Sequence, residues 1–166
     1  YRQNFFGLVH NLDIGPGVLT SDLRYFISTD DGANAYDPGY FTTGYYGNGT
    51  LKGKVDNDLY SGLFTYSVAG STFGLGYEVS EGQSDFPYLN QGDGPTTYTI
   101  TEMQIQKFVR AGEKSWQARY SFDFAKVGLP GASAGVVYVK GNDINTLASS
   151  NSSEWERDIT LSYVVQ

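Results

Sequence analysis

The sequence contains no cysteine, one methionine and one histidine among its 166 residues. Without cysteine, a disulfide framework, a thiolate metal site and a thiol nucleophile are all excluded. The lone His10 has no second histidine beside which to hold a metal, and no serine and acid that strand parity would bring to it as a catalytic triad. We therefore predict a structural histidine, no catalytic residue, no metal and no cofactor.

Positive charge is also scarce, since 11 lysines and arginines stand against 18 aspartates and glutamates and give a formal charge of −7. No basic stripe exists to neutralise phosphates, which excludes a nucleic-acid partner. No apolar run approaches the roughly 18 residues that a spanning helix requires, and the first residues lack the zones of a signal peptide. We expect the chain to be either mature or an internal part of a longer polypeptide.

Aromatic and turn-forming residues are abundant, with 14 tyrosines, 10 phenylalanines and 21 glycines, a composition typical of all-β proteins. Most of the predicted strands have about ten residues or more, which suits a tilted membrane strand better than the usual globular strand. Alternation with a period of two predicts seven strands, near residues 2–13, 17–29, 55–69, 71–80, 114–126, 131–140 and 154–165.

The connections between these strands alternate in length. Those near 14–17, 69–70 and 128–131 are tight, whereas 30–54, 81–113 and 141–153 are long, polar and rich in glycine, serine, asparagine and aspartate. Short turns on one side and long loops on the other are typical of outer-membrane barrels. The sequence therefore favours a transmembrane antiparallel β-barrel.

The two faces of each strand support the same conclusion. In SWQARYSFDFA one face carries aromatic side chains such as Trp116 and Tyr120, and the other carries Gln117, Arg119 and Asp123. In any single strand, this alternation of apolar and polar residues is also explained by a soluble sheet with one face in contact with water. Rings near the strand ends favour the aromatic girdles of a membrane barrel. The alternatives are a soluble β-sandwich or jelly-roll carbohydrate-binding module, with glycans stacking on tryptophan and tyrosine, and a barrel enzyme, for which no constellation of nucleophile and base is found.

Several motifs resemble the OprD family of outer-membrane porins, and they span nearly the whole chain: HNLDIGPG, SDLRYF, LFTYSVAGSTFGLGYEVSEG, FVRAGEKSWQARYSFDFAKVGLPG, YVKGND and EWERDITLSYVVQ. The resemblance implies an eighteen-stranded barrel in the outer membrane of a Gram-negative bacterium. Residues 1–166 would then be a single partial domain of seven strands, without the N-terminal half and the last two strands of the barrel. Seven strands in lipid leave unpaired edges, so we do not expect a finished pore from this stretch alone.

The resemblance also implies passive, selective diffusion of small carboxylates or basic amino acids along a basic ladder, a column of lumen-facing cations. Arginine suits this role because its planar guanidinium pairs with a carboxylate in a bidentate way. The ladder candidates are Arg119, Arg24 and Arg110. For Arg119 and Arg24, a structural ion pair with a neighbouring acid is the alternative. The pore-lining candidates are Asp123, Ser121, Gln117, Asp22, Glu78 and Asp158, and the candidates for the loop constriction are Asp93, Glu102 and Tyr98.

Other residues bear on partners and specificity. Val137 stands where many members of the family carry a basic residue, which leaves the preferred solute open. Lys140 and Arg157 have outward parity, so they are expected either to pair with lipopolysaccharide head groups or to snorkel at strand ends. The expected partners are small anionic or zwitterionic solutes and outer-membrane lipid, and the expected assembly is a monomer or a loose trimer.

Overall fold

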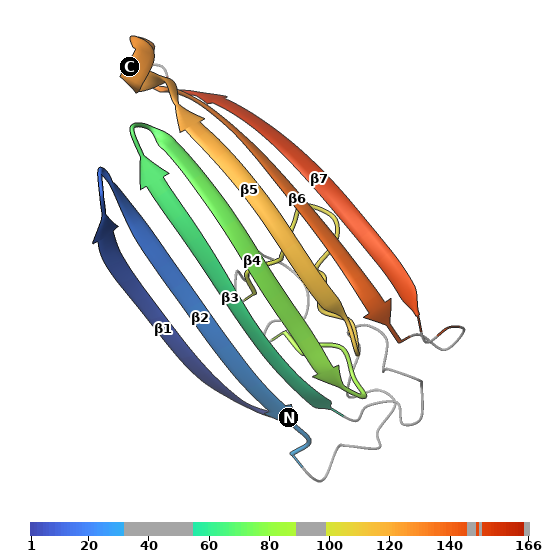
Figure 1. The fold of residues 1–166 in the computed structure, drawn as a ribbon. Coiled ribbons are helices and arrows are strands. Elements are labelled where there is room, and N and C mark those ends of the chain that lie inside the picture. The colour runs from blue at the N-terminus through green and yellow to red at the C-terminus, as the bar shows by residue number, and fades with distance from the viewer. Residues whose placement is uncertain (32–54, 89–98, 146–148, 150, 165–166) are drawn as a thin grey trace.

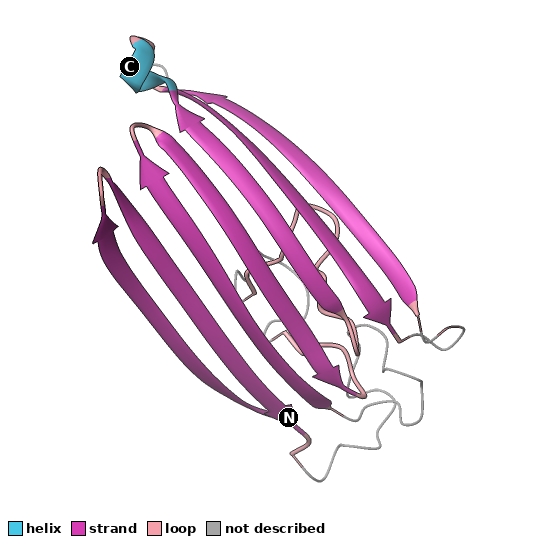
Figure 2. Cartoon of the chain, in the orientation of Figure 1, coloured by secondary structure: helices cyan, strands magenta, loops and turns pink. Residues whose placement is uncertain are grey.

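A computed structural model describes residues 1–31, 55–88, 99–145, 149 and 151–164, which form seven long strands and one turn of 3-10 helix (Figures 1 and 2). Within these ranges, no helix is long and apolar enough to cross a membrane. The strands are β1 (Arg2–Ile14), β2 (Gly17–Thr29), β3 (Asp56–Val68), β4 (Ser71–Gly82), β5 (Lys114–Asp123), β6 (Ala132–Ile144) and β7 (Ser152–Tyr163), and the helix is η1 (Phe124–Val127).

Each strand pairs antiparallel with the next along the chain, in one seven-stranded sheet of order β1 to β7. Figure 1 shows the sheet as a single curved layer, which is the arrangement of a barrel wall. A β-sandwich needs two sheets packed face to face, and the described strands make only one. The soluble sandwich considered from the sequence is therefore not supported.

The connections at the two ends of the sheet differ as the sequence predicts. The β1–β2 turn is tight, with Gly15 at a φ of 57° before Pro16, the arrangement of a type II′ hairpin turn. The β3–β4 turn consists of Ala69 and Gly70, both at positive φ, as a two-residue type I′ turn requires. The strand ends that lead into the longer connections, such as Thr29 and Asp56, lie together at the opposite end of the sheet (Figure 1).

The third short connection differs from the prediction. Strand β5 was expected to run to residue 126 and to be followed by a tight turn, but it ends at Asp123 and the chain then forms η1. The Asp123 side chain accepts a hydrogen bond from the N–H of Ala125, and Gly128 ends the turn at a φ of 90°. An aspartate that caps the helix and a glycine that ends it explain why the alternating pattern does not continue as strand.

One face of the sheet, here called the outer face, is apolar and exposed. Leu75 and Leu161 keep 67% and 79% of their surfaces accessible. Rings lie side by side on this face near both strand ends, as in the pairs Trp116–Tyr138 and Phe73–Tyr120, with centroids 5.2 and 4.9 Å apart. An exposed apolar sheet flanked by aromatic residues is the surface that a barrel presents to lipid.

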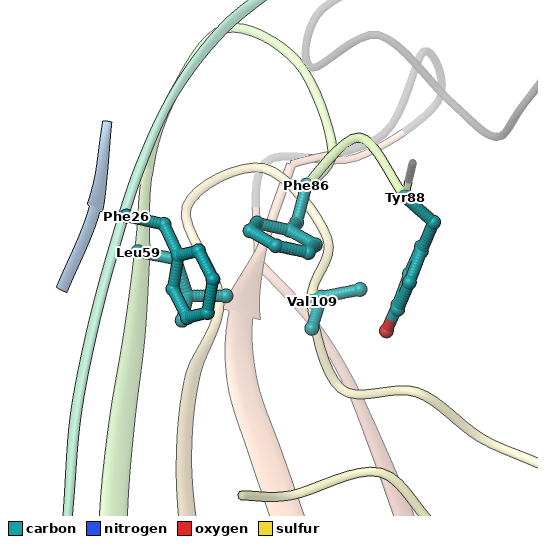
Figure 3. Packing of buried hydrophobic residues seen from close by; sticks show 5 residues of the cluster. All are labelled: Phe26, Leu59, Phe86, Tyr88 and Val109. Atoms are coloured by element: carbon teal, nitrogen blue, oxygen red, sulfur yellow. The ribbon is translucent and has the colours of Figure 1, made fainter. Parts of the chain in front are cut away.

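The opposite face, called the inner face, is covered in part by the segment between β4 and β5. Residues 83–88 and 99–113 of this segment, called the infolded segment, lie behind the sheet in Figure 1. Their apolar contacts with the wall form one buried cluster of Phe26, Leu59, Phe86, Tyr88 and Val109 (Figure 3). The rings of Phe26 and Phe86 meet edge to face, 5.1 Å apart. The main apolar core therefore joins the segment to the wall.

Candidate functional site

The strand register gathers the predicted pore-lining residues on the inner face. Residues paired directly across an antiparallel sheet share a face, and Gln117 pairs with Gly76, whose row continues through Leu63 to Asp22. The row of Glu78 contains Ser61 and Arg24 in the same way. The inner-face set is Asp22, Arg24, Glu78, Gln117, Arg119, Ser121, Asp123 and Asp158.

Glu78 anchors the infolded segment to β4. It is almost completely buried, and its carboxylate accepts hydrogen bonds from the N–H of Ile100, at 3.3 Å, and from the hydroxyl of Thr101. A buried carboxylate is costly unless such donors compensate for the lost water. Glu78 is therefore a structural anchor of the infolded segment.

Two acids of β7 hold the tip of the infolded segment. One oxygen of Glu156 accepts from the N–H of Ile105 at 2.9 Å, and the other accepts from Gln106 at 2.6 Å. The carboxylate of Asp158 accepts a hydrogen bond from the N–H of Gln104 at 3.4 Å. The carboxylate of Glu156 thus fixes the distance between the tip and the wall, a role that strand parity alone did not predict.

Gln117 and Arg119 hold the same segment from β5. The Gln117 amide donates to the carbonyl oxygen of Ile100 at 2.6 Å, and the Arg119 guanidinium donates to that oxygen at 2.8 Å and, through Nε, to the Gln117 side-chain oxygen at 2.7 Å. Arg119 makes no ion pair within the described ranges, so the predicted alternative of a salt bridge to Asp123 is not found.

Glycines on β4 make room for these two side chains. A Cβ atom built on Gly74 would lie 2.5 Å from Cγ of Arg119, and one built on Gly76 would lie 2.8 Å from Cγ of Gln117. Both long side chains therefore lie across the neighbouring strand instead of projecting straight from the wall. This pairing of a glycine with a long polar residue was missed from the sequence, because it becomes visible only when the register is known.

Arg24 lies beside Asp22 on β2, two residues away on the same face. Its Nε and Nη2 donate to the two carboxylate oxygens of Asp22 at 3.0 and 2.6 Å, a bidentate ion pair. Both side chains remain partly exposed. The structure therefore contains the ion pair that was the predicted alternative for Arg24, and the guanidinium still borders the open inner face.

Arg110 and its neighbours lie where the infolded segment returns to the sheet. The Nε of Arg110 is 3.5 Å from a carboxylate oxygen of Glu154, and its backbone N–H donates to Glu113 at 2.9 Å. Burial raises the pKa of Glu113 to about 7, and the hydrogen bond from Arg110 opposes that rise. Asp85 accepts the N–H of Ala111 at 2.9 Å. Several acids of this segment are therefore used to satisfy its own backbone.

A cavity of about 370 Å³ lies between the infolded segment and β7. Phe86 and Tyr88 line it beside the charged side chains of Lys107, Arg110 and Glu154. The ammonium of Lys107 lies 4.2 Å from the centre of the Tyr88 ring. The cavity combines apolar walls with charges of both signs, a lining that suits small amphipathic solutes.

The remaining predicted residues are less informative. Burial raises the pKa of Glu102, a half-buried acid of the infolded segment, and the charge of Lys107 opposes that rise. Ser121 is exposed on the inner face, and Asp123 caps η1 at the short-turn rim. Asp93 and Tyr98 lie outside the described residues. Nowhere in the described ranges do three His, Cys, Asp or Glu side chains gather as a metal ion would require.

On the outer face, Lys140 lies between Trp116 of β5 and Trp155 of β7. Arg157 lies opposite Tyr138 on the same face, while Val137 lies on the inner face between Arg119 and Asp158. The outward parity predicted for the two cations is confirmed by this register.

A single sheet with an apolar outer face, a polar and charged inner face and a segment folded against the inner face defines an outer-membrane β-barrel protein. The model of the family described as outer membrane porin, OprD family, matches residues 1–166. The chain belongs to this family, which places it in the outer membrane of a Gram-negative bacterium.

Individual relatives agree with this assignment. Porin-like protein GalP of Pseudomonas putida is 30% identical over 166 residues, which are all of this chain and 35% of that protein. The crystal structure of Pseudomonas aeruginosa OccK8 (OprE) has a TM-score of 0.88 and 53% identity, covering 98% of this chain and 42% of that one. For P. aeruginosa OccK5 (OpdH) the TM-score is 0.84 and the identity 37%, with 99% and 40% covered. The chain thus spans less than half the length of these relatives.

Proposed function

We propose that this chain forms part of the wall of a channel through which small carboxylates or basic amino acids diffuse passively, without catalysis and without a cofactor. The observation that carries the proposal is the placement of Arg24 and Arg119 on one inner face, beside Asp22, Gln117 and the infolded segment, to which Arg119 donates a hydrogen bond. Charges of both signs along one polar face suit anionic and zwitterionic solutes.

The existing partners of the two guanidinium groups support weak binding of a solute. Arg24 is held by Asp22, and Arg119 by two neutral oxygens, so a solute carboxylate exchanges with a partner that is already present. Breaking the existing contact of the arginine costs part of the free energy that binding the solute supplies, so the solute is bound weakly at each site. A solute that is bound weakly at several successive sites can leave the channel again. Arg110, paired loosely with Glu154, extends the proposed basic ladder to the infolded segment.

The proposal extends to the whole pore and its surroundings. These seven strands are proposed to belong to a longer polypeptide that closes an eighteen-stranded barrel, as a monomer or a loose trimer. The share of the relatives that the chain covers supports this, as do the edges that β1 and β7 present within the sheet. Outside, lipid and lipopolysaccharide are the proposed partners, and the position of Lys140 between two tryptophans supports contact with anionic head groups.

The proposal is tested with Arg119→Gln and Arg24→Gln in the full-length polypeptide, reconstituted in planar bilayers with benzoate as the probe solute. We expect stepwise conductance in the unsubstituted protein, and in each variant a half-blocking benzoate concentration about three- to tenfold higher, because a charged hydrogen-bond donor is lost.

Arg157→Gln is the matched control, because it removes the same charge from the outer face. It should leave conductance and benzoate block unchanged. A protein that gives no conductance steps would exclude the channel itself. Equal block in all three variants would show that the inner arginines do not bind the solute.

A further inference from the structure

The tip of the infolded segment presents three successive backbone N–H groups, those of Gln104, Ile105 and Gln106, to carboxylates of the wall. The turn is closed by a hydrogen bond of 3.0 Å from the N–H of Met103 to the carbonyl oxygen of Gln106. Successive N–H groups in a turn form a concave site with partial positive charge that binds anions. In this structure Glu156, from the protein itself, occupies that site with both of its oxygens.

The tip and the base of the segment differ in how accessible they are. At the base, Glu78 and its partner Thr101 are almost completely buried, so that anchor is closed to solutes. At the tip, Gln104 and Ile105 are exposed, and Ile105 keeps 80% of its surface accessible. A solute that reaches the inner face can therefore approach the tip while the base stays attached, although the buried carboxylate of Glu156 must move before the N–H groups of Ile105 and Gln106 become accessible.

The chemistry of the occupant identifies the ligand. A solute carboxylate carries the same two oxygens and the same charge as the Glu156 side chain, so both compete for the same donors. Lys107, the next residue after the tip, supplies an exposed positive charge beside them. The exchange conserves hydrogen bonds, because the solute takes up the two N–H groups that Glu156 releases, while the freed Glu156 carboxylate takes up the water that the solute gives up.

We propose that the backbone N–H groups of residues 104–106 form a carboxylate-binding site that Glu156 occupies as an internal competitor. A permeating carboxylate displaces Glu156 and detaches the tip from β7, so the solute itself loosens the narrow part of the passage. This inference rests on the proposed function, since it requires that carboxylates enter the lumen. It makes Glu156 a residue that sets the affinity for the solute without binding it.

The experiment uses the full-length polypeptide with benzoate as the probe and has two readouts. The first is the half-blocking benzoate concentration in planar bilayers. Glu156→Gln retains one acceptor oxygen but loses the charge and the second acceptor, so benzoate should bind about tenfold more tightly. Asp13→Asn is the control, because Asp13 is an inner-face acid far from the tip, at the short-turn end of β1. It removes the same charge and should leave the value unchanged.

The second readout is the mobility of a spin label on Ile105→Cys. Benzoate should increase this mobility in the protein with Glu156, and should increase it much less in the Glu156→Gln background, where fewer hydrogen bonds hold the tip to β7. Glu156→Asp keeps the charge on a shorter side chain, so the tip should be mobile with little change in ion selectivity.

The outcomes separate the two proposals. Conductance without any effect of benzoate on the label would overturn the internal-competitor proposal and leave the channel intact. Equal shifts in block for Glu156→Gln and Asp13→Asn would also overturn it, since only the overall charge would then matter. Absence of conductance would refute the channel, and the competitor proposal with it.

Discussion

Replacing Gly74 by alanine should move the Arg119 side chain away from the wall. The added methyl group would lie 2.5 Å from Cγ and 3.0 Å from Cδ of Arg119, and 3.2 Å from Cγ2 of Thr65. Because Cγ lies near the base of the side chain, the arginine must change rotamer, and its guanidinium then leaves the oxygens of Gln117 and Ile100. The same movement carries the charge toward the lumen, so single-channel conductance should change as well.

The expected loss of stability follows from those two contacts. A hydrogen bond from a charged donor contributes about 1.5–3 kcal/mol, and rehydration of the guanidinium recovers part of the two-bond total. The glycine-to-alanine change itself stabilises by about 0.4–1 kcal/mol, because it restricts the unfolded chain. We therefore expect Gly74→Ala to lower the free energy of unfolding by about 1–2 kcal/mol, measured by guanidinium unfolding in lipid vesicles with tryptophan fluorescence.

Gly135→Ala is the matched control for this experiment. Gly135 also lies on the inner face of a strand, but a Cβ atom there would have its nearest neighbours, Ser121 and Tyr120, at 3.6 Å. This variant should be neutral or slightly more stable than the original protein. Unfolding free energies that agree within about 0.5 kcal/mol for the two variants would refute the idea that Gly74 is needed to make room for Arg119.

Three further predictions concern the anchor, a titrating acid and the lipid face. Glu78→Ala removes the hydrogen-bond acceptor at the base of the infolded segment. The segment should then detach more often, so trypsin should cut faster after Lys107; an unchanged cleavage rate would contradict the role of Glu78 as an anchor. Because the pKa of Glu113 is raised to about 7, the packed segment binds its proton more tightly than the opened one and loses stability as pH rises from about 5 through 7. Glu113→Gln should weaken that dependence in hydrogen exchange of the segment, and an unchanged dependence would assign it to another group. Leu75→Arg on the outer face should cost about 2–4 kcal/mol of folding free energy in vesicles, whereas Ser121→Arg on the inner face should cost little, and equal costs would contradict the assignment of the faces.

The strands and their faces were predictable because a period of two is a local property of the sequence. Trp116 and Gln117 fall on opposite faces whatever the rest of the chain does, and the hairpin turns at Gly15 and Gly70 carry their own signals. The end of β5 was misplaced because Phe124 continues the apolar alternation, and only the cap formed by Asp123 interrupts it. A single side-chain hydrogen bond thus outweighed the pattern.

The candidate site was predictable only in part. Parity placed Arg24, Arg119 and Glu78 on the inner face, but it gave no information on which backbone groups they meet. The infolded segment has no periodicity, so its contacts with Glu156 depend on how the chain folds back over distances of about 50 residues. The contacts that hold the segment in place form because its buried backbone N–H groups need hydrogen-bond acceptors. Residue periodicity along the sequence does not show which side chains will supply those acceptors.

The glycines beside long polar residues have a consequence for the calibre of the passage. At two positions where β4 pairs with β5, a glycine lies opposite a long side chain: Gly74 opposite Arg119 and Gly76 opposite Gln117. The combined side-chain volume of the two paired residues, more than the volume of either residue alone, determines how far atoms extend from the wall. Substituting one member therefore changes both the width of the passage and the angle at which its partner points. Neighbouring strands are thus constrained to vary together, and an engineer who wishes to widen or narrow the passage at one level should exchange both residues of the pair.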